Sequence, residues 1–284
     1  MSRYVYVNGK YKCYKDSNTH VEDRGLQFSD GVYEVIGVWK SKPIDFSLHL
    51  DGLYRSMNEL YFSSVPSGKF ISIVTKEVIR LNKINYGTIY IQINRGISKR
   101  NHIFPENKKY TISVIARNGL SFREISETAG ISAITTKDQR WDRRDIKSVS
   151  LLANVLAKQK ASSNNSSESI LFDNNNCVTE ASTSNVWIVN DNNELLTHPA
   201  NNKILNGVTR TRIIKIAESL KLNICQKPFK VEEMYEAKEV FLTGTTIGVK
   251  PVIKIDNFNI SKCKIGLCTI KLKDEYLKFL NRIN

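Results

Sequence analysis

Runs in which apolar and polar residues alternate, separated by runs with helical spacing, constrain the fold of this chain most. The alternating runs predict strands at residues 4–7, 32–38, 88–94, 111–116, 131–136, 170–172, 185–189, 240–243 and 252–255. Helical spacing predicts a helix capped by Ser47, a second over residues 70–81, a stripe over 149–156 and a further helix over 213–220. The pattern therefore indicates a mixed α/β chain without internal repeats.

At 284 residues the chain has the length at which hydrophobic cores divide. The polar, loosely patterned tract at residues 119–128 is the best candidate for a linker. We therefore expect a smaller N-terminal α/β domain over residues 1–118 and a larger C-terminal domain over residues 129–284. A second polar tract, residues 162–176, is expected to be a surface loop interrupted by the short strand at 170–172.

Composition excludes several classes of protein. No run approaches the ~20 apolar residues of a membrane span, and the N-terminus lacks the apolar stretch of a secretory signal, so a cytoplasmic protein is expected. The five cysteines are scattered without a CxxC pair, which predicts free thiols and no metal site. The net charge of +14 is diffuse. Its densest part, the basic stretch at residues 251–284, has no aromatic residues interleaved in an RNA-binding pattern, so a solvated basic surface is favoured over a nucleic-acid site.

Lys147 is a candidate for covalent chemistry. It stands where an extended segment meets an apolar helical stripe, a place that can hold a side chain rigidly. Burial and cationic neighbours can lower the pKa of a lysine until its amine forms a Schiff base, and Arg143 and Arg144 precede it closely. Taken alone, a solvated surface lysine is the commoner case.

Two segments could bind an anion. Residues 206–210 lead into the helix predicted over 213–220, so backbone N–H groups and the Thr209 hydroxyl could converge on a phosphate. Residues 243–246 follow a predicted strand and combine three threonines with a glycine that allows close backbone approach. Each signal is weak alone, because a threonine before a helix is more often only a cap.

Three further residues carry side chains that could bind a charged ligand. Arg100 and His102 are two residues apart in a loop, and in an extended segment both would point the same way and could bind one carboxylate. Glu180 lies among small polar residues just before a strand. If it is buried it needs a cationic partner, and a protonated heteroaromatic nitrogen would serve.

These segments, in this order, resemble the class IV (fold-type IV) pyridoxal-phosphate aminotransferases, and within them the bacterial D-amino-acid aminotransferases. The signature EDRGLQFSDGVYEV at residues 22–35 is similar to the family's N-terminal motif. DIKS at 145–148 and NVLAKQ at 154–159 are similar to its lysine region. The resemblance runs from about residue 6 to 255 and implies a two-domain fold with a barrel-like sheet in the C-terminal, cofactor-binding domain.

The resemblance also implies roles for individual residues. Lys147 matches the Schiff-base lysine, which also moves the α-proton, and Glu180 matches the acid that keeps the pyridine nitrogen protonated. Leu205 matches the residue packed against the cofactor ring. The phosphate cup is matched by Val208, Thr209 and Thr245. The substrate carboxylate trap is matched by Tyr33, Arg100 and His102, with Arg100 and His102 supplied across a homodimer interface.

The implied reaction is transamination of D-amino acids such as D-alanine and D-glutamate with 2-oxo acids such as 2-oxoglutarate. The alternatives are a branched-chain L-amino-acid aminotransferase or an aminodeoxychorismate lyase of the same fold, neither of which is expected to show the Arg-x-His loop. A basic nucleic-acid-binding protein that has lost catalysis is a remote alternative.

One position departs from the family pattern. The family places a phosphate-binding arginine where this chain has Gly52. Arg55 follows one helical turn later and could reach the phosphate instead, because residues three apart share a helix face. A hydrogen bond to a charged group contributes ~1.5–3 kcal/mol, so the change is expected to weaken cofactor binding.

Overall fold

The computed structural model describes residues 3–106, 109–119, 125 and 129–283, which form two compact units. The first unit contains the described residues up to 119 together with Ile146–Ser150. The second contains residue 125, residues 129–145 and Leu151–Arg282. The linker predicted at 119–128 falls mostly on residues outside the described ranges. The five-residue segment around Lys147 belongs by its contacts to the first unit, although it follows that linker in sequence.

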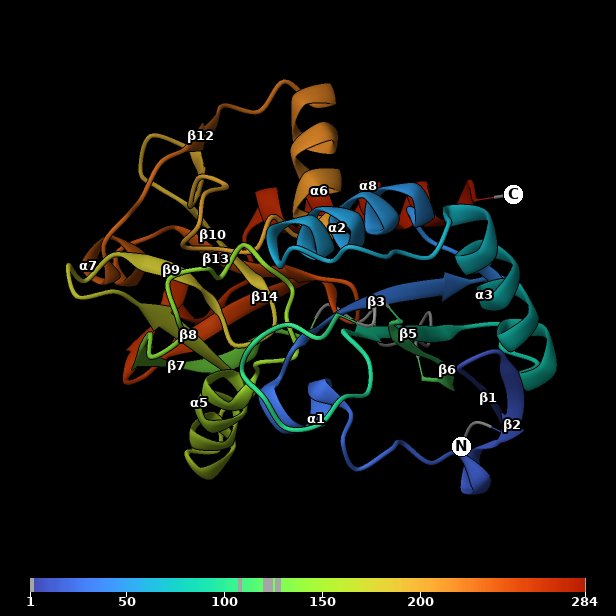
Figure 1. Ribbon diagram of the computed structural model, residues 1–284. Helices are drawn as coiled ribbons and strands as arrows, with labels where there is room; N and C mark the ends of the chain where they lie inside the picture. The colour runs from blue at the N-terminus through green and yellow to red at the C-terminus, as the bar shows by residue number, and fades with distance from the viewer. Residues whose placement is uncertain (1–2, 107–108, 120–124, 126–128, 284) are drawn as a thin grey trace. The chain divides into compact units, whose positions relative to one another are not determined.

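The first unit is built on a six-stranded sheet with the order β2-β1-β6-β5-β3-β4 (Figure 1). Its strands are β1 (Tyr4–Val7), β2 (Lys10–Cys13), β3 (Gly31–Trp39), β4 (Lys42–Pro43), β5 (Gly87–Asn94) and β6 (Thr111–Asn118). All pairs of neighbours are antiparallel. The helices are α1 (Arg24–Phe28), α2 (Phe46–Glu59) and α3 (Gly68–Asn82), and a 3-10 turn spans Tyr14–Asp16.

Alternation along β3 and β5 separates a core face of this sheet from a polar face. Ile36 of β3 and Ile91 of β5 are fully buried and pack with Leu53 of α2 and Val74 of α3. Residues at the alternate positions of these strands, such as Tyr33 of β3 and Tyr90 of β5, point to the opposite face and are partly exposed. One face of the sheet thus forms the core with α2 and α3, and the other is left for polar side chains.

Two helix starts differ from the sequence-based prediction. Ser47 lies inside α2, whose N-cap is Asp45, so the prediction of Ser47 as the cap was wrong. The helix after Lys147, α5 (Leu152–Ser163), begins three residues later than the apolar stripe suggested. Val149 lies in a bend instead, because its N–H donates to the Gly31 carbonyl oxygen of β3 at 3.0 Å. Pairing with a strand has overridden the helical spacing at this point.

The second unit contains a larger sheet, with nine strands among the described residues. Its order is β12-β11-β10-β13-β14-β7-β8-β9, with β15 paired to β14. The strands are β7 (Ile131–Lys137), β8 (Glu168–Phe172), β9 (Val178–Ala181), β10 (Asn185–Val189), β11 (Leu195–Thr197), β12 (Ile224–Gln226), β13 (Glu239–Gly244), β14 (Gly248–Ile255) and β15 (Phe258–Asn259). The helices are α5, α6 (Val208–Ser219), α7 (Val231–Tyr235) and α8 (Leu267–Asn281), with a 3-10 turn at Ile260–Cys263.

This second sheet curls into a half-barrel, as expected for the C-terminal part of the chain. Buried aliphatic side chains of β8, β10, β13 and β14 form a core on one face of this sheet. Trp187 and Phe241, at the alternate positions of β10 and β13, stack on the other face with ring centroids 5.6 Å apart. The helix α5 packs on β7 and β8, and α8 packs on β13 and β14. Within the described ranges, no helix is long and apolar enough to span a membrane.

Candidate active site

Lys147 is held by its backbone against the edge of the first unit's sheet. The Tyr33 N–H donates to the Lys147 carbonyl oxygen at 3.0 Å, and the Lys147 N–H donates to the Ser56 hydroxyl on α2 at 3.2 Å. The neighbouring Ser148 forms an isolated bridge with Val32 of β3. Bonds on both sides of the residue therefore fix the point from which the lysine side chain leaves the backbone.

The Lys147 side chain lies against aromatic rings on the polar face of that sheet. Its ammonium nitrogen is 4.6 Å from the centroid of the Tyr33 ring, and Tyr33 stacks on Tyr90 at 5.6 Å. Burial raises the pKa of Tyr90 to about 12, with Tyr33 adding to the increase and the Lys147 charge opposing it. The lysine is partly buried, so it is neither a solvated surface residue nor closed off from a ligand. Lys147 and Tyr33, both predicted site residues, are brought together.

Arg100 and His102 meet on one aromatic ring. The Arg100 guanidinium lies 4.7 Å from the centroid of the Phe28 ring, and the His102 ring lies 5.2 Å from it. Both side chains are exposed in the single chain. The segment bends here, so the extended geometry expected from the sequence was wrong. The ring of Phe28, and not strand alternation, is what groups the two residues.

The loop that carries this pair is anchored by Arg24. The buried Arg24 guanidinium donates to Asp30 at 2.8 Å and to the backbone carbonyl of Asn101 at 2.6 Å, between the two loop residues. Asp30 also accepts from Arg95 at the start of the loop, at 2.8 Å. The Arg95 guanidinium covers the ring of Phe104 at 3.7 Å. Asp30, Arg24 and Arg95 thus hold the loop in place at its start, at Asn101 and at Phe104.

The family resemblance implies that this loop binds the substrate carboxylate, so we expect Arg24→Met to raise the KM for that substrate at least about tenfold while lowering kcat much less. The substitution removes a charge-assisted bond of ~1.5–3 kcal/mol that holds the loop, and the loop then orders only at a cost to binding. Steady-state kinetics measures the two constants, and thermal melting shows whether the variant folds. Arg24→Lys keeps the charge but lacks the planar guanidinium that donates to two partners at once, and it should give an intermediate KM. An unchanged KM in a folded Arg24→Met protein would contradict this role.

Gly52 lies in α2 beside a buried hydrogen bond between His49 and Glu34. A Cβ built at Gly52 would be 3.2 Å from a carboxylate oxygen of Glu34, whose other oxygen is 2.8 Å from the His49 ring. A larger side chain at this position therefore has to push Glu34 aside by a few tenths of an ångström. Arg55 stands one turn later on α2 and is exposed. Its role in binding the phosphate stays a prediction.

In the second unit, Glu180 is a buried carboxylate at the end of β9, with only 5% of its surface exposed. One oxygen accepts from the Leu205 N–H at 3.1 Å and from the Asn185 amide at 3.2 Å. The other accepts from the Arg140 guanidinium. Burial raises the pKa of Glu180, and Arg140 acts against that rise. The expectation that a buried Glu180 needs a cationic partner is met within the chain itself by Arg140.

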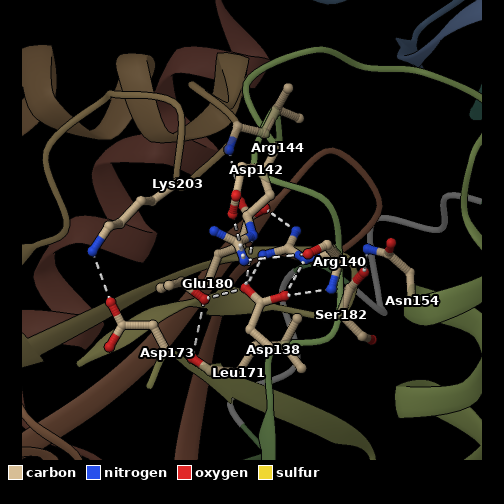
Figure 2. Close-up of polar contacts among 12 residues, drawn as sticks. Asp138, Arg140, Asp142, Arg144, Asn154, Leu171, Asp173, Glu180, Ser182 and Lys203 are labelled. Atoms are coloured by element: carbon tan, nitrogen blue, oxygen red, sulfur yellow. Dashed lines mark hydrogen bonds and ion pairs between the residues drawn. The ribbon is translucent and has the colours of Figure 1, made fainter. Parts of the chain in front are cut away.

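A row of alternating charges leads away from Glu180 (Figure 2). Arg140 forms two bonds with Asp138, at 2.9 Å from Nε and 2.7 Å from Nη2. Asp138 also accepts from the Thr179 hydroxyl at 2.8 Å and lies 3.2 Å from the Arg144 guanidinium. These contacts lower the pKa of Asp138 although burial opposes them. The order along the row is therefore Arg144, Asp138, Arg140 and Glu180, with cations and anions alternating.

The candidate phosphate-binding segments gather near Glu180. The helix α6 begins at Val208, so Thr209 is its second residue and not the cap that a threonine before a helix would be. The N-cap is Gly207, which provides no side chain to accept from the first turn. A Cβ at Gly207 would be 2.3 Å from the Asn185 amide oxygen, so glycine is required for this approach.

Thr245 stands in the turn between β13 and β14, at the same end of the sheet. Asn185 of β10 pairs with Thr243 of β13, two residues before Thr245. The structure therefore brings Glu180, Leu205, the start of α6 and Thr245 to one end of the second sheet. It brings Lys147, Tyr33 and the Phe28 group together in the first unit. The candidate residues thus form two sets, each within its own unit.

The residues that support these candidates were not predicted from the sequence. Asp138, Arg140, Asp142 and Arg144 alternate in sign at every second position, a signal that could have predicted a charged row. Arg143 and Arg144, noted there as cationic neighbours of the lysine, are paired with carboxylates, Arg143 with Asp145 at 3.1 Å. The contacts of Arg24 carry no local signal, because its partners include the Asn101 carbonyl, 77 residues away.

The family of the chain follows from comparison with known proteins. A model of the class IV aminotransferases matches residues 31–255, a range that includes predicted site residues of both units. The chain belongs to the class IV aminotransferases. It is 37% identical to a D-alanine aminotransferase of Listeria innocua, over 98% of this chain and 96% of that protein. It is 35% identical to a D-alanine aminotransferase of Staphylococcus aureus strain N315, over 97% of each.

Solved structures agree on the fold. The branched-chain amino acid aminotransferase of Escherichia coli has a TM-score of 0.91 at 23% identity, covering 99% of this chain and 95% of that one. The T.th. branched-chain amino acid aminotransferase, solved with pyridoxamine 5'-phosphate, has a TM-score of 0.91 at 24% identity, covering 99% and 94%. At this identity the likeness shows the fold alone. The predictions of fold-type IV architecture, of an aminotransferase and of pyridoxal phosphate as its cofactor are confirmed.

Proposed function

We propose that this aminotransferase acts on D-amino acids such as D-alanine and D-glutamate, with a 2-oxo acid such as 2-oxoglutarate as the acceptor. The observation that carries the proposal is the 37% identity to a D-alanine aminotransferase along 98% of the chain. The grouping of Arg100 and His102 on Phe28 supports it, because that pair distinguishes the D-specific members in the sequence resemblance.

The residues present suit pyridoxal phosphate. Glu180 is a carboxylate that accepts a hydrogen bond from Arg140, and its negative charge suits a protonated ring nitrogen. The α6 N-terminus has an N-cap without a side-chain acceptor, so its first-turn N–H groups and the Thr209 hydroxyl suit a phosphate. Lys147, Leu205, Val208 and Thr245 complete the proposed set, with Arg55 on α2. When bound, the cofactor supplies an electron sink for the pair released from the substrate α-carbon.

The protein's own groups supply the remaining chemistry. We assign to Lys147 the attachment of the cofactor and, as a free amine, the transfer of the proton from the α-carbon. Its fixed backbone limits how far the amine can move while doing so. Glu180 holds a proton on the ring nitrogen by remaining an anion beside it.

The substrate carboxylate is assigned to Tyr33, Arg100 and His102. The arginine offers two parallel N–H donors to a carboxylate, and the histidine adds a third. Both loop residues are exposed in the single chain, which suits a role in a homodimer in which the loop of one protomer serves the site of the other. The homodimer is part of this proposal.

The proposal is tested by mixing the protein and pyridoxal phosphate with D-alanine or L-alanine and following the absorption spectrum. We expect D-alanine to change the spectrum and, with 2-oxoglutarate, to yield pyruvate and glutamate. L-alanine and L-leucine should do neither at a comparable rate. Faster turnover of L-leucine than of D-alanine would overturn the proposal and favour a branched-chain L-specific enzyme.

We expect Gly52→Arg to tighten pyridoxal phosphate binding by about tenfold to a hundredfold. The substitution restores the arginine that the family places there, and a hydrogen bond to a charged group contributes ~1.5–3 kcal/mol. Titration of the cofactor into apoprotein measures the change. Gly52→Ala is the control, since it improves helix propensity by ~1 kcal/mol without adding a charge. Equal affinity of Gly52→Arg and Gly52→Ala would contradict the interpretation of this position.

A further inference from the structure

Arg140 is the cation that contacts Glu180 in the described part of the second unit. Its guanidinium is largely buried and lies between two carboxylates, bonded twice to Asp138 and once to Glu180 (Figure 2). Asp138 has two further partners in Arg144 and the Thr179 hydroxyl. Asp138 would therefore be satisfied without Arg140, whereas Glu180 has Arg140 as its contacting cation among the described residues.

The two bonds to Asp138 fix the orientation of the guanidinium. A planar guanidinium held along one edge presents its remaining Nη1 in a set direction, and here that direction is toward Glu180. The opposite oxygen of Glu180 is held by the Leu205 N–H and the Asn185 amide. The carboxylate is thus fixed from both sides before any ligand binds.

A fixed cation beside Glu180 decides where a shared proton resides. A proton between a carboxylate and a pyridine nitrogen can lie on either, and the ionic arrangement places positive charge on the nitrogen and negative charge on the carboxylate. A cation next to the carboxylate stabilises that anion and repels a proton placed on it. Burial works in the opposite direction, because it favours the neutral acid.

Two other charged groups, Asp138 and Arg210, interact electrostatically with Glu180. Asp138 lies behind Arg140 and disfavours a charge on Glu180, but Arg144 offsets it. From α6, Arg210 is a second cation, and burial lowers its pKa to about 10 while Glu180 raises it. Arg210 donates to the Asn206 amide oxygen, to the His198 carbonyl oxygen and to Gln226, and not to the Glu180 carboxylate. Arg140 is therefore the cation that acts on Glu180 by direct contact.

We infer that Arg140 is a positioning residue for the reaction: its guanidinium keeps Glu180 ionised and oriented, so that the proton shared with a bound pyridine nitrogen lies on the nitrogen. The inference rests on the proposed role of Glu180 and adds a residue to which the comparisons assign no role. Arg140 does not touch the reacting atoms and acts only through the carboxylate.

The test compares Arg140→Met, Arg140→Lys and the wild-type protein loaded with pyridoxal phosphate carrying ¹⁵N in its ring. The ¹⁵N chemical shift reports whether the ring nitrogen is protonated. In parallel, ¹³C-labelled apoprotein gives the titration of the Glu180 carboxyl, assigned by its absence in Glu180→Gln. Arg80→Met is the matched control, because Arg80 also forms a two-bond pair with a carboxylate, Glu77, but on the exposed face of α3.

In Arg140→Met we expect the ring-nitrogen signal to move toward the unprotonated form and the pKa of Glu180 to rise in the apoprotein. We expect kcat to fall by about tenfold to a hundredfold. Arg140→Lys should restore the ring-nitrogen signal, and Arg80→Met should match the wild-type protein in all three measurements. If Arg140→Met does not fold, Arg140→Gln, which keeps a hydrogen-bond donor for the two carboxylates but carries no charge, is measured in its place.

An unchanged ring-nitrogen signal and an unchanged Glu180 titration in the folded variant would overturn the inference, even if kcat falls. That result would mean that Arg140 only stabilises the fold. Failure of the wild-type protein to transaminate D-alanine would reject the proposed substrate instead. The Glu180 titration in apoprotein would still decide the coupling to Arg140, since it needs neither cofactor nor substrate.

Discussion

Lys147→Ala is expected to lower kcat by about 10⁴-fold, the largest effect of any single substitution in this chain. The change removes the amine that attaches the cofactor and moves the α-proton, and a positioned general base contributes up to about 10⁴ to the rate. The backbone should remain in place, because its bonds to Tyr33 and Ser56 do not involve the side chain. The protein should therefore still fold and melt near the wild-type temperature.

Single-turnover kinetics with D-alanine measures this loss, and two further results separate it from misfolding. An added small primary amine should restore part of the rate to Lys147→Ala, because it supplies the missing base. Borohydride reduction followed by peptide mass spectrometry should locate the cofactor on Lys147 in the wild-type protein. Lys76→Ala, an exposed lysine of α3, is the control and should keep full activity. Covalent label on another lysine would reject the assignment.

Glu180→Gln is expected to lower kcat by about 10²–10³-fold. The amide keeps the size of the side chain, and its single oxygen can still accept from the Leu205 N–H, but it carries no negative charge and its NH2 group cannot accept from Arg140. The ring nitrogen then loses the anion that holds its proton, and removing a fixed charge from a buried site has effects of this magnitude. Rapid-mixing spectroscopy with D-alanine measures the rate of the first half-reaction.

A second buried glutamate of the same unit provides the control for Glu180→Gln. Glu168 is 3% exposed and accepts from the Thr183 hydroxyl at 2.9 Å, with Lys158 at 3.2 Å. Glu168→Gln should lower the thermal stability and leave the rate of the half-reaction nearly unchanged. Equal losses of rate in the two variants would show that the loss comes from disturbing the fold and would contradict the charge-based role of Glu180.

Local patterns in the sequence predicted the longer strands well. The runs at 32–38, 88–94 and 185–189 correspond to β3, β5 and β10. Among the short strands, β1 was predicted, whereas β9 and β11, with four and three residues, are too short to show a clear period and were missed. The helix α8 was missed because its residues were interpreted only as a basic stretch. Its stripe of Leu272, Tyr276 and Leu280 is buried in the structure.

Sequence by itself determined the family and the identity of the candidate groups, because several motifs of reactive residue types occur in one order along nearly the whole chain. It also located the departure at Gly52. Only the tertiary structure decided which residues form hydrogen bonds and ion pairs with those groups. The pairing of Arg140 with Glu180 spans 40 residues and that of Arg24 with the Asn101 carbonyl spans 77. Such contacts depend on which strands and loops become neighbours, and chain folding, not local spacing, brings their charges within hydrogen-bonding distance.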